Sequence, residues 1–153
     1  MSKIFIIVSV VVPLVLYFVF PLVLARFAQR AVSRTPLAIA CVLFFVSWYL
    51  PSPDIEGRYT AFTTHAVGGG VFTGFLWLYV RQFFSRKFQP LTELAILYFF
   101  VSGLGVANEL FEFAVVTFGF ARLDPSDTWW DLVANTIGVS VFWIGTLFWK
   151  RIK

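Results

Sequence analysis

Five apolar runs, separated by short charged segments, constrain the fold of this chain more than any other feature. The runs cover residues 4–25, 35–50, 59–80, 91–118 and 129–149. About 20 apolar residues in a helix cross the hydrocarbon core of a bilayer. Helices also satisfy their own backbone hydrogen bonds, as lipid requires. We therefore predict an all-α, integral membrane helical bundle of about five transmembrane helices, with residues 1–153 forming a single transmembrane domain.

The composition suits a chain that is surrounded by lipid. Hydrophobic residues make up 59% of the 153 residues and charged residues only 13%, which excludes an ordinary soluble domain. The basic residues lie between the apolar runs, so the net charge of +4 does not indicate a nucleic acid partner. The single cysteine, Cys41, excludes an intramolecular disulfide and offers no cysteine-based metal motif. The expected partner is the lipid bilayer, and the expected location is the inner (plasma) membrane, crossed several times.

The first two apolar runs differ in length, and the third contains regularly spaced small residues. The first run is followed by three arginines, which is typical of a retained span rather than a cleaved signal peptide. The second run, closed by Pro51 and Pro53, is short for a full span. In the third run Ala66, Gly70 and Gly74 recur every four residues. This stripe predicts close packing of one helix face against another helix.

The distribution of basic residues predicts the orientation. If all five runs span the membrane, three basic segments share one side, and they hold nine of the twelve basic residues: Arg26, Arg30, Arg34, Arg81, Arg86, Lys87, Lys150, Arg151 and Lys153. The other side holds Lys3, Arg58 and Arg122. By the positive-inside rule the C-terminus lies in the cytoplasm and the N-terminus outside.

Polar residues inside the apolar runs predict a site. Ionisable groups in membrane segments are costly and by default mark function. In the predicted orientation His65, Glu109, Glu112, Asp131 and Asn135 all lie in the outer half of the membrane. At 1.5 Å per helical residue, His65 and Glu112 are roughly 9 Å and Glu109 roughly 13 Å below the outer ends of their runs. The spacing of Glu109 and Glu112, and that of Asp131 and Asn135, also puts each pair on one helix face. We expect a polar pocket that opens outward between the third, fourth and fifth runs.

Each of these residues also has a purely structural interpretation. His65 fits a satisfied interior histidine, and Glu109 and Glu112 fit a pair that shares a proton or meets Arg122. Asp131 fits a helix N-cap, and Asn135 fits a hydrogen bond between helices. Glu93, near the basic side, is expected to face lipid headgroups or Arg86.

The charge balance of the predicted pocket suggests what completes it. Glu109, Glu112 and Asp131 face only His65 and Arg122 as bases. Three close carboxylates with so few partners do not all stay ionised in a dry site, so protons, a cation or a cationic ligand completes it. Carboxylates and a histidine are metal ligands. The chain has no strong metal motif, however, and we predict no metal site and name no cofactor or catalytic residue.

Part of the chain resembles a known family. The order Glu109-Leu-Phe-Glu112, Arg122, then Asp131-Leu-Val-Ala-Asn135-Thr-Ile-Gly138 resembles the VanZ-like family of small polytopic membrane proteins, over roughly residues 54–145. Glu112 stands where that family has glutamine. The resemblance implies a link to the cell envelope and, in the family's named member, to low-level resistance to the glycopeptide teicoplanin. Residues 127–131 are also similar, more loosely, to a signature of YjdF-like inner-membrane proteins.

These observations lead to one functional expectation and two alternatives. We expect an outward-facing pocket that binds an envelope amphiphile, a headgroup or a cation through His65, Glu109, Glu112, Arg122, Asp131 and Asn135. One alternative is an intramembrane hydrolase or transferase acting on envelope lipid, with Glu109 or Glu112 as general base and His65 as acid. The other is a structural subunit that packs against other membrane proteins in a larger complex.

Overall fold

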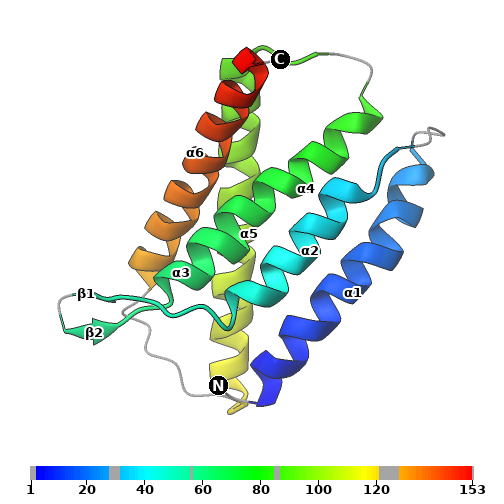
Figure 1. Cartoon of the computed structure of the whole chain (residues 1–153). Helices are drawn as coiled ribbons and strands as arrows, with labels where there is room; N and C mark the ends of the chain where they lie inside the picture. The colour runs from blue at the N-terminus through cyan, green and yellow to red at the C-terminus, as the bar shows by residue number, and fades with distance from the viewer. Residues whose placement is uncertain (1–2, 28–31, 56, 85–86, 121–127, 153) are drawn as a thin grey trace.

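The computed structural model describes residues 3–27, 32–55, 57–84, 87–120 and 128–152. Its helical segments are α1 (Lys3–Ala25), α2 (Thr35–Ser47), α3 (Phe62–His65), η1 (Ala66–Val71), α4 (Phe72–Val80), η2 (Arg81–Phe83), α5 (Pro90–Thr117) and α6 (Thr128–Ile152). Because α3, η1, α4 and η2 follow one another without a gap, the described residues form five helical rods (Figure 1). The prediction of an all-α bundle is confirmed.

A small β-hairpin is the one addition to the helices in the described residues. The two-residue strands β1 (Asp54–Ile55) and β2 (Arg58–Tyr59) pair antiparallel. Gly57, with a φ of +77°, occupies a backbone conformation of the turn that side chains disfavour. The hairpin joins the end of α2 to the start of α3 (Figure 1).

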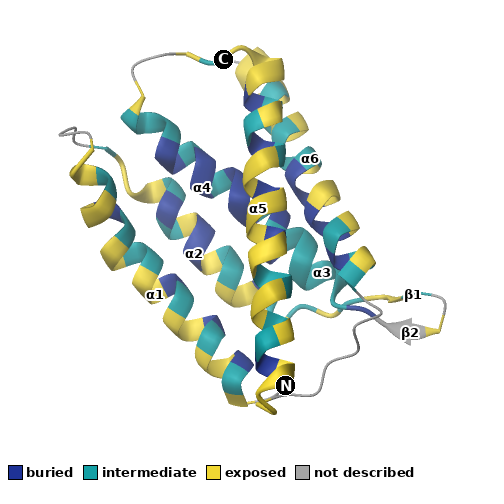
Figure 2. Cartoon of the chain, turned by 180° about the vertical axis from the view of Figure 1, so that it is seen from behind, coloured by how far each residue is buried: buried dark blue, intermediate teal, exposed yellow. Residues whose placement is uncertain are grey.

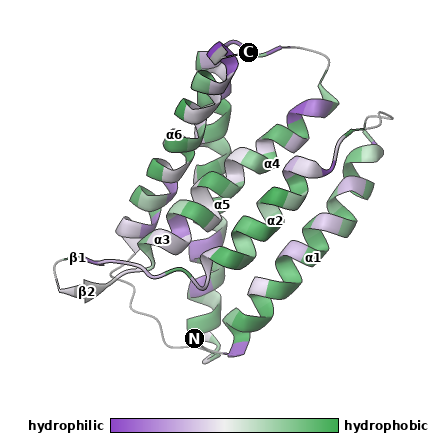
Figure 3. Ribbon diagram, viewed as in Figure 1, coloured by the Kyte–Doolittle hydropathy of each residue, from purple (hydrophilic) through white to green (hydrophobic). Residues whose placement is uncertain are grey.

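Three helices are long and apolar enough to cross a membrane: Lys3–Ala25, Pro90–Thr117 and Thr128–Arg151. Their outer faces carry exposed apolar side chains, which suits contact with lipid; on α1 these are Ile6, Ile7, Val10, Val11, Leu14, Val15, Phe18, Val19, Leu22 and Val23. Figure 2 shows many exposed residues along α1, α5 and α6, and Figure 3, from the opposite side, shows these helices as largely hydrophobic. The second run is shorter than the 35–50 that the sequence predicts, because α2 ends at Ser47 after 13 residues, about 20 Å.

The rods alternate in direction and leave the two chain ends at opposite ends of the bundle (Figure 1). We call one end the basic end: it holds the α1–α2 and α4–α5 connections and the last residues of α6. The other, which we call the hairpin end, holds the start of α1, the β-hairpin and the first residues of α6. In the described residues the basic end carries Arg26, Arg34, Arg81, Lys87, Lys150 and Arg151.

Two apolar clusters hold the bundle together around α4. One side of α4 packs on α2 through Leu37, Cys41, Phe72, Leu76 and Tyr79, among others. The other side packs on α5 and α6 through Trp77, Val80, Leu97, Val101 and Val139. Cys41 is a free cysteine and is buried in the first cluster. α4 is thus the central element, which Figure 2 shows as largely buried.

The closest contact between rods joins η1 to α6 and depends on glycine. A Cβ added to Gly138 would overlap the backbone carbonyl of Ala66, and one added to Gly70 would lie 2.6 Å from the Cα of Gly138. A Cβ on Gly74 would collide with the ring of Phe142. The predicted stripe of Ala66, Gly70 and Gly74 is therefore confirmed as a packing surface, and α6 is the helix that it meets.

Replacing Gly138 with alanine tests this contact. Gly138→Ala should lower the free energy of unfolding by about 1–3 kcal/mol, the usual cost of overpacking, because its Cβ meets backbone that cannot turn away. Gly145→Ala on the same helix is the matched control, since a Cβ there meets nothing within 4 Å. Unfolding of the detergent-purified protein, followed by circular dichroism, measures both. Equal stability of the two variants would contradict the close contact.

Candidate functional site

His65 and Asp131 meet at the hairpin end, between the third rod and α6. His65 is the last residue of α3, and Asp131 lies in the first turn of α6. The Nε2 atom of His65 is 3.3 Å from Oδ2 of Asp131, and the two side chains are 13% and 2% exposed. An acidic residue suits the first turn of a helix, where the backbone N–H groups point toward it. A buried carboxylate in a membrane-length helix is therefore held against an imidazole.

Asn135 lies one turn further along α6 and is 5% exposed. It fits between two glycines on different rods. A Cβ on Gly69 would overlap its Oδ1 atom, and a Cβ on Gly105 of α5 would lie 3.3 Å from its Nδ2 atom. Within the described residues, Oδ1 of Asn135 is buried and makes no hydrogen bond. A buried acceptor in that state costs about 1–3 kcal/mol, and such groups are rare enough to need an explanation.

The backbone beside this cluster is a π-helix. It begins directly after His65, covers Ala66–Val71 and contains three consecutive glycines. Single π-helical turns inside longer helices are uncommon and often coincide with functional sites. The hydroxyl of Thr73 donates to the carbonyl oxygen of Gly69 at 2.6 Å. This π-helical turn lies against α6 beside Asn135, whose side chain occupies the space next to Gly69.

Glu109 is joined to the same end of α6. Its Oε2 atom accepts a hydrogen bond from the hydroxyl of Thr128, at 2.8 Å. Thr128 is the first residue of α6 and precedes Asp131 by one turn. Glu112, one turn further along α5, accepts a hydrogen bond from Nδ2 of Asn108 at 2.8 Å. Both glutamates are half-buried.

The predicted site residues thus fall into three groups. The structure brings His65, Asp131 and Asn135 together, and it links Glu109 to the helix that carries two of them. Glu112 is hydrogen-bonded to a neighbour on its own helix. Arg122 lies outside the described residues, as do Asp124 and Asp127, which the sequence would place at the outer rim of the predicted pocket. Among the described residues, no group of three or more histidine, cysteine, aspartate or glutamate side chains is arranged to hold a metal ion.

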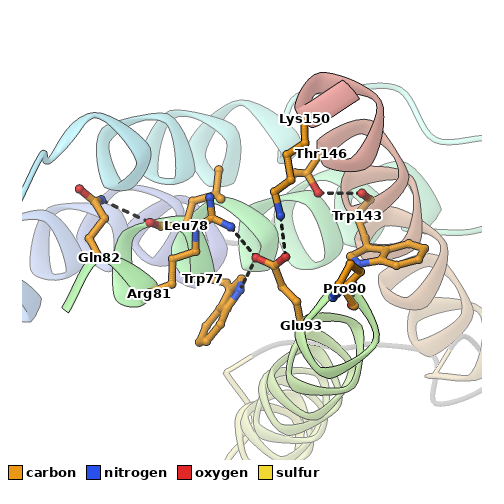
Figure 4. Close-up of polar contacts among 9 residues, drawn as sticks. All are labelled: Trp77, Leu78, Arg81, Gln82, Pro90, Glu93, Trp143, Thr146 and Lys150. Carbon is orange, nitrogen blue, oxygen red and sulfur yellow. Dashed lines mark hydrogen bonds and ion pairs between the residues drawn. The ribbon is translucent and has the colours of Figure 1, made fainter. Parts of the chain in front are cut away.

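A second buried carboxylate, Glu93, lies at the basic end (Figure 4). Its side chain is 5% exposed, so the expectation that it faces headgroups is wrong. Its Oε1 atom accepts hydrogen bonds from Nη1 of Arg81 and from Nε1 of Trp77, and its Oε2 atom lies 2.9 Å from Nζ of Lys150. We call Glu93, Arg81 and Lys150 the Glu93 cluster. Arg86, the partner that the sequence suggested, lies outside the described residues.

The sequence offered one signal for this cluster. Glu93 is in the first turn of α5 and Lys150 in the last turn of α6, positions that suit an acid and a base respectively. Charges placed at helix ends in this way indicate a buried cluster only when the ends are known to meet. Here α4, α5 and α6 bring three ends together (Figure 4).

Comparison of the chain with protein-family models, curated proteins and solved structures found no significant match.

A double-mutant cycle tests the contact between His65 and Asp131. Combining His65→Ala with Asp131→Ala should give a coupling energy in the range of about 0.5–3 kcal/mol that is typical of contacting residues. As a control, His65→Ala and Lys150→Gln should be additive, because 19 residues of α6, about 28 Å of helix, separate Lys150 from Asp131. Unfolding in detergent micelles supplies the energies. Additivity in both pairs would show that His65 and Asp131 do not interact.

Proposed function

We propose that this chain is a five-span membrane protein of VanZ-like type, which binds the cationic or hydrogen-bond-donating headgroup of an envelope amphiphile. The binding site is formed by His65, Asp131 and Asn135, with Glu109 beside it. The observation that carries the proposal is the buried His65–Asp131 pair next to Asn135, whose buried Oδ1 makes no hydrogen bond within the described residues. A donor group on a ligand would satisfy that acceptor.

The proposed topology rests on the two ends of the bundle. Five rods that alternate in direction suit five spans, although α2 is short and needs local thinning of the bilayer or a contribution from flanking residues. The basic end carries most of the basic residues, so by the positive-inside rule it faces the cytoplasm. In this orientation the hairpin end and the His65–Asp131 pair lie in the outer half of the membrane.

The chemistry of the ligand follows from the charges at the hairpin end. Asp131, Glu109 and Glu112 are acceptors when ionised, and His65 is the one histidine of the chain. A carboxylate in a segment of low dielectric is stabilised by a nearby cation or strong donor. An ammonium headgroup supplies up to three N–H donors, and its acyl chains would remain in the surrounding lipid. An amphiphile with an amine headgroup is therefore the ligand class that we favour.

The resemblance to the VanZ-like family also leads us to propose a phenotype. Two of the positions that carry the VanZ-like resemblance, Asn135 and Gly138, both lie where α6 meets η1, so the motif coincides with the closest packing of the bundle. On that basis we extend the proposal to the cell envelope and to tolerance of teicoplanin.

One observation favours a second candidate, an intramembrane hydrolase or transferase. A carboxylate that holds an imidazole in place is the orienting part of several acid–base arrangements. In this reading His65 exchanges protons with the substrate and Asp131 positions it, with the pair at 3.3 Å. The binding proposal and this one differ in a simple observable, because only an enzyme would convert the bound lipid.

Lipid retention tests the binding proposal. The purified full-length protein should retain phosphatidylethanolamine in native mass spectra, and Asp131→Asn should reduce that retention about tenfold. This is what the loss of one charge-assisted hydrogen bond of roughly 1.4 kcal/mol or more predicts. Phosphatidylglycerol with the same acyl chains has no amine, and its retention should not respond to Asp131→Asn.

Asp54→Asn is the matched control, because it removes an exposed carboxylate from the same end of the bundle. It should leave both lipids unaffected. Equal losses in Asp54→Asn and Asp131→Asn would contradict a specific site and leave only surface charge. Appearance of a cleaved or transferred lipid during incubation with the wild-type protein would favour the enzyme instead.

Reporter fusions test the proposed topology. A reporter that is active only in the cytoplasm, fused after Lys153, should be active, and the same reporter inserted in the β-hairpin after Gly57 should be inactive. The expected pattern follows from the distribution of basic residues. Activity at the hairpin would invert the bundle and place the His65–Asp131 pair in the cytoplasmic half.

A further inference from the structure

The Glu93 cluster presents two cations on one buried carboxylate. Arg81 contacts one oxygen of Glu93 and Lys150 contacts the other. Glu93 is 5% exposed, whereas the side chains of Arg81 and Lys150 are 33% and 46% exposed. The carboxylate of Glu93 is therefore buried, and the two cations that contact it are partly exposed at the surface of the protein. Because both cations contact the same carboxylate group, their positive groups lie close to each other.

The cluster has more positive charge than its own carboxylate balances. Two cations meet one anion, and in the described residues Glu93 is the only carboxylate with which they form ion pairs. A guanidinium has five N–H donors and an ammonium three, and the bonds to Glu93 use one donor of each. The unused donors and the excess charge suit a ligand with a single anionic group.

Apolar surface lies directly beside the cations. Trp77, which donates to Glu93, packs its ring on Phe84, Phe88 and Phe100 at centroid distances of 5.4–6.3 Å. Trp77 itself is 2% exposed, whereas Phe84 is 50% exposed. Half-exposed Phe84 leaves part of this aromatic group open beside the cluster. A ligand that reaches the cations can therefore lay apolar chains on the same surface.

We propose that Arg81 and Lys150 bind the phosphate of an anionic phospholipid at the basic end. Glu93 is a positioning residue, which holds the two cations side by side and offsets part of their repulsion. Basic sites between helices at the cytoplasmic membrane surface are suited to such headgroups. This inference does not depend on the amine-binding site, which lies at the opposite end and has the opposite charge.

A cluster that only ties helix ends together would look different in a binding experiment. An acid in the first turn of α5 and a base in the last turn of α6 stabilise those helices whatever the lipid. Such a cluster would respond to substitution in its stability but not in its choice of lipid. The test therefore measures lipid selectivity and stability separately.

The experiment uses the full chain in bilayer nanodiscs of phosphatidylcholine with and without phosphatidylglycerol. Binding of phosphatidylglycerol, measured as its enrichment around the protein relative to the bulk bilayer, should fall about fivefold in Lys150→Gln, because one of the two charge-assisted contacts to the phosphate is lost. Lys87→Gln removes an exposed cation at the same end, outside the cluster, and is the matched control. It should retain the enrichment of the wild type.

Two conservative variants keep the test informative if Lys150→Gln unfolds. Lys150→Arg and Arg81→Lys preserve the charge, and both should keep an enrichment close to that of the wild type. Loss of the enrichment in a folded variant of either kind would contradict binding through these cations. Equal losses in Lys87→Gln and Lys150→Gln, or no loss in either, would overturn the proposal and leave a general charge effect or a structural cluster. Competition by millimolar inorganic phosphate, which has no acyl chains, would instead show a site for free phosphate.

Discussion

The close approach of η1 and α6 is the constraint on which the polar centre at the hairpin end depends. Helices in contact usually lie 8–10 Å apart, but here the backbone of Gly138 lies against that of Ala66 and Gly70. Short side chains such as those of Asp131 and Asn135 reach a neighbouring rod only when the backbones are this near. In lipid, where apolar burial between helices gives little driving force, small residues permit the packing that holds helices together. The glycines therefore allow both the close packing of the two helices and the contact of the polar side chains across them.

The two buried polar centres differ in how completely they are satisfied. Glu93 receives hydrogen bonds or ion pairs from three side chains on two neighbouring rods. At the hairpin end His65 meets Asp131, while Oδ1 of Asn135 is buried without a hydrogen bond in the described part of the chain. Fully paired buried charges favour one arrangement of the helices, whereas incomplete pairing leaves a site that a ligand can complete. The buried carboxylate at the basic end is thus suited to holding helix ends together beneath the partly exposed Arg81 and Lys150. At the hairpin end, by contrast, the buried groups themselves are left for a ligand to complete.

Sequence reasoning reached the helical architecture and part of the polar centre, for identifiable reasons. Apolar length and the 3.6-residue period place Asp131, Asn135 and Gly138 on one face of a helix, and all three are buried in the structure. Asn108 and Glu112 are four residues apart, so helical spacing alone predicts that their side chains are in contact. The partners of Glu93 were out of reach, because 12 and 57 residues separate it from Arg81 and Lys150 and only the tertiary arrangement joins them. The shorter α2 was also missed, since hydropathy continues past Ser47 although the helix does not.

The π-helical turn sets the rotational phase of the third rod. A π-turn accommodates one residue more than an α-turn would, and it occurs here within a run of three glycines. If the same segment were regular α-helix, the residues on its two sides would be rotated by about 100° relative to one another, the angle of one helical residue. Phe72 and Leu76 would then no longer face α2 when His65 faces α6. A regular α-helix would keep both alignments only with one residue fewer, so the π-turn is what lets all three glycines lie in this segment while one continuous rod presents a polar face to one neighbour and an apolar face to another.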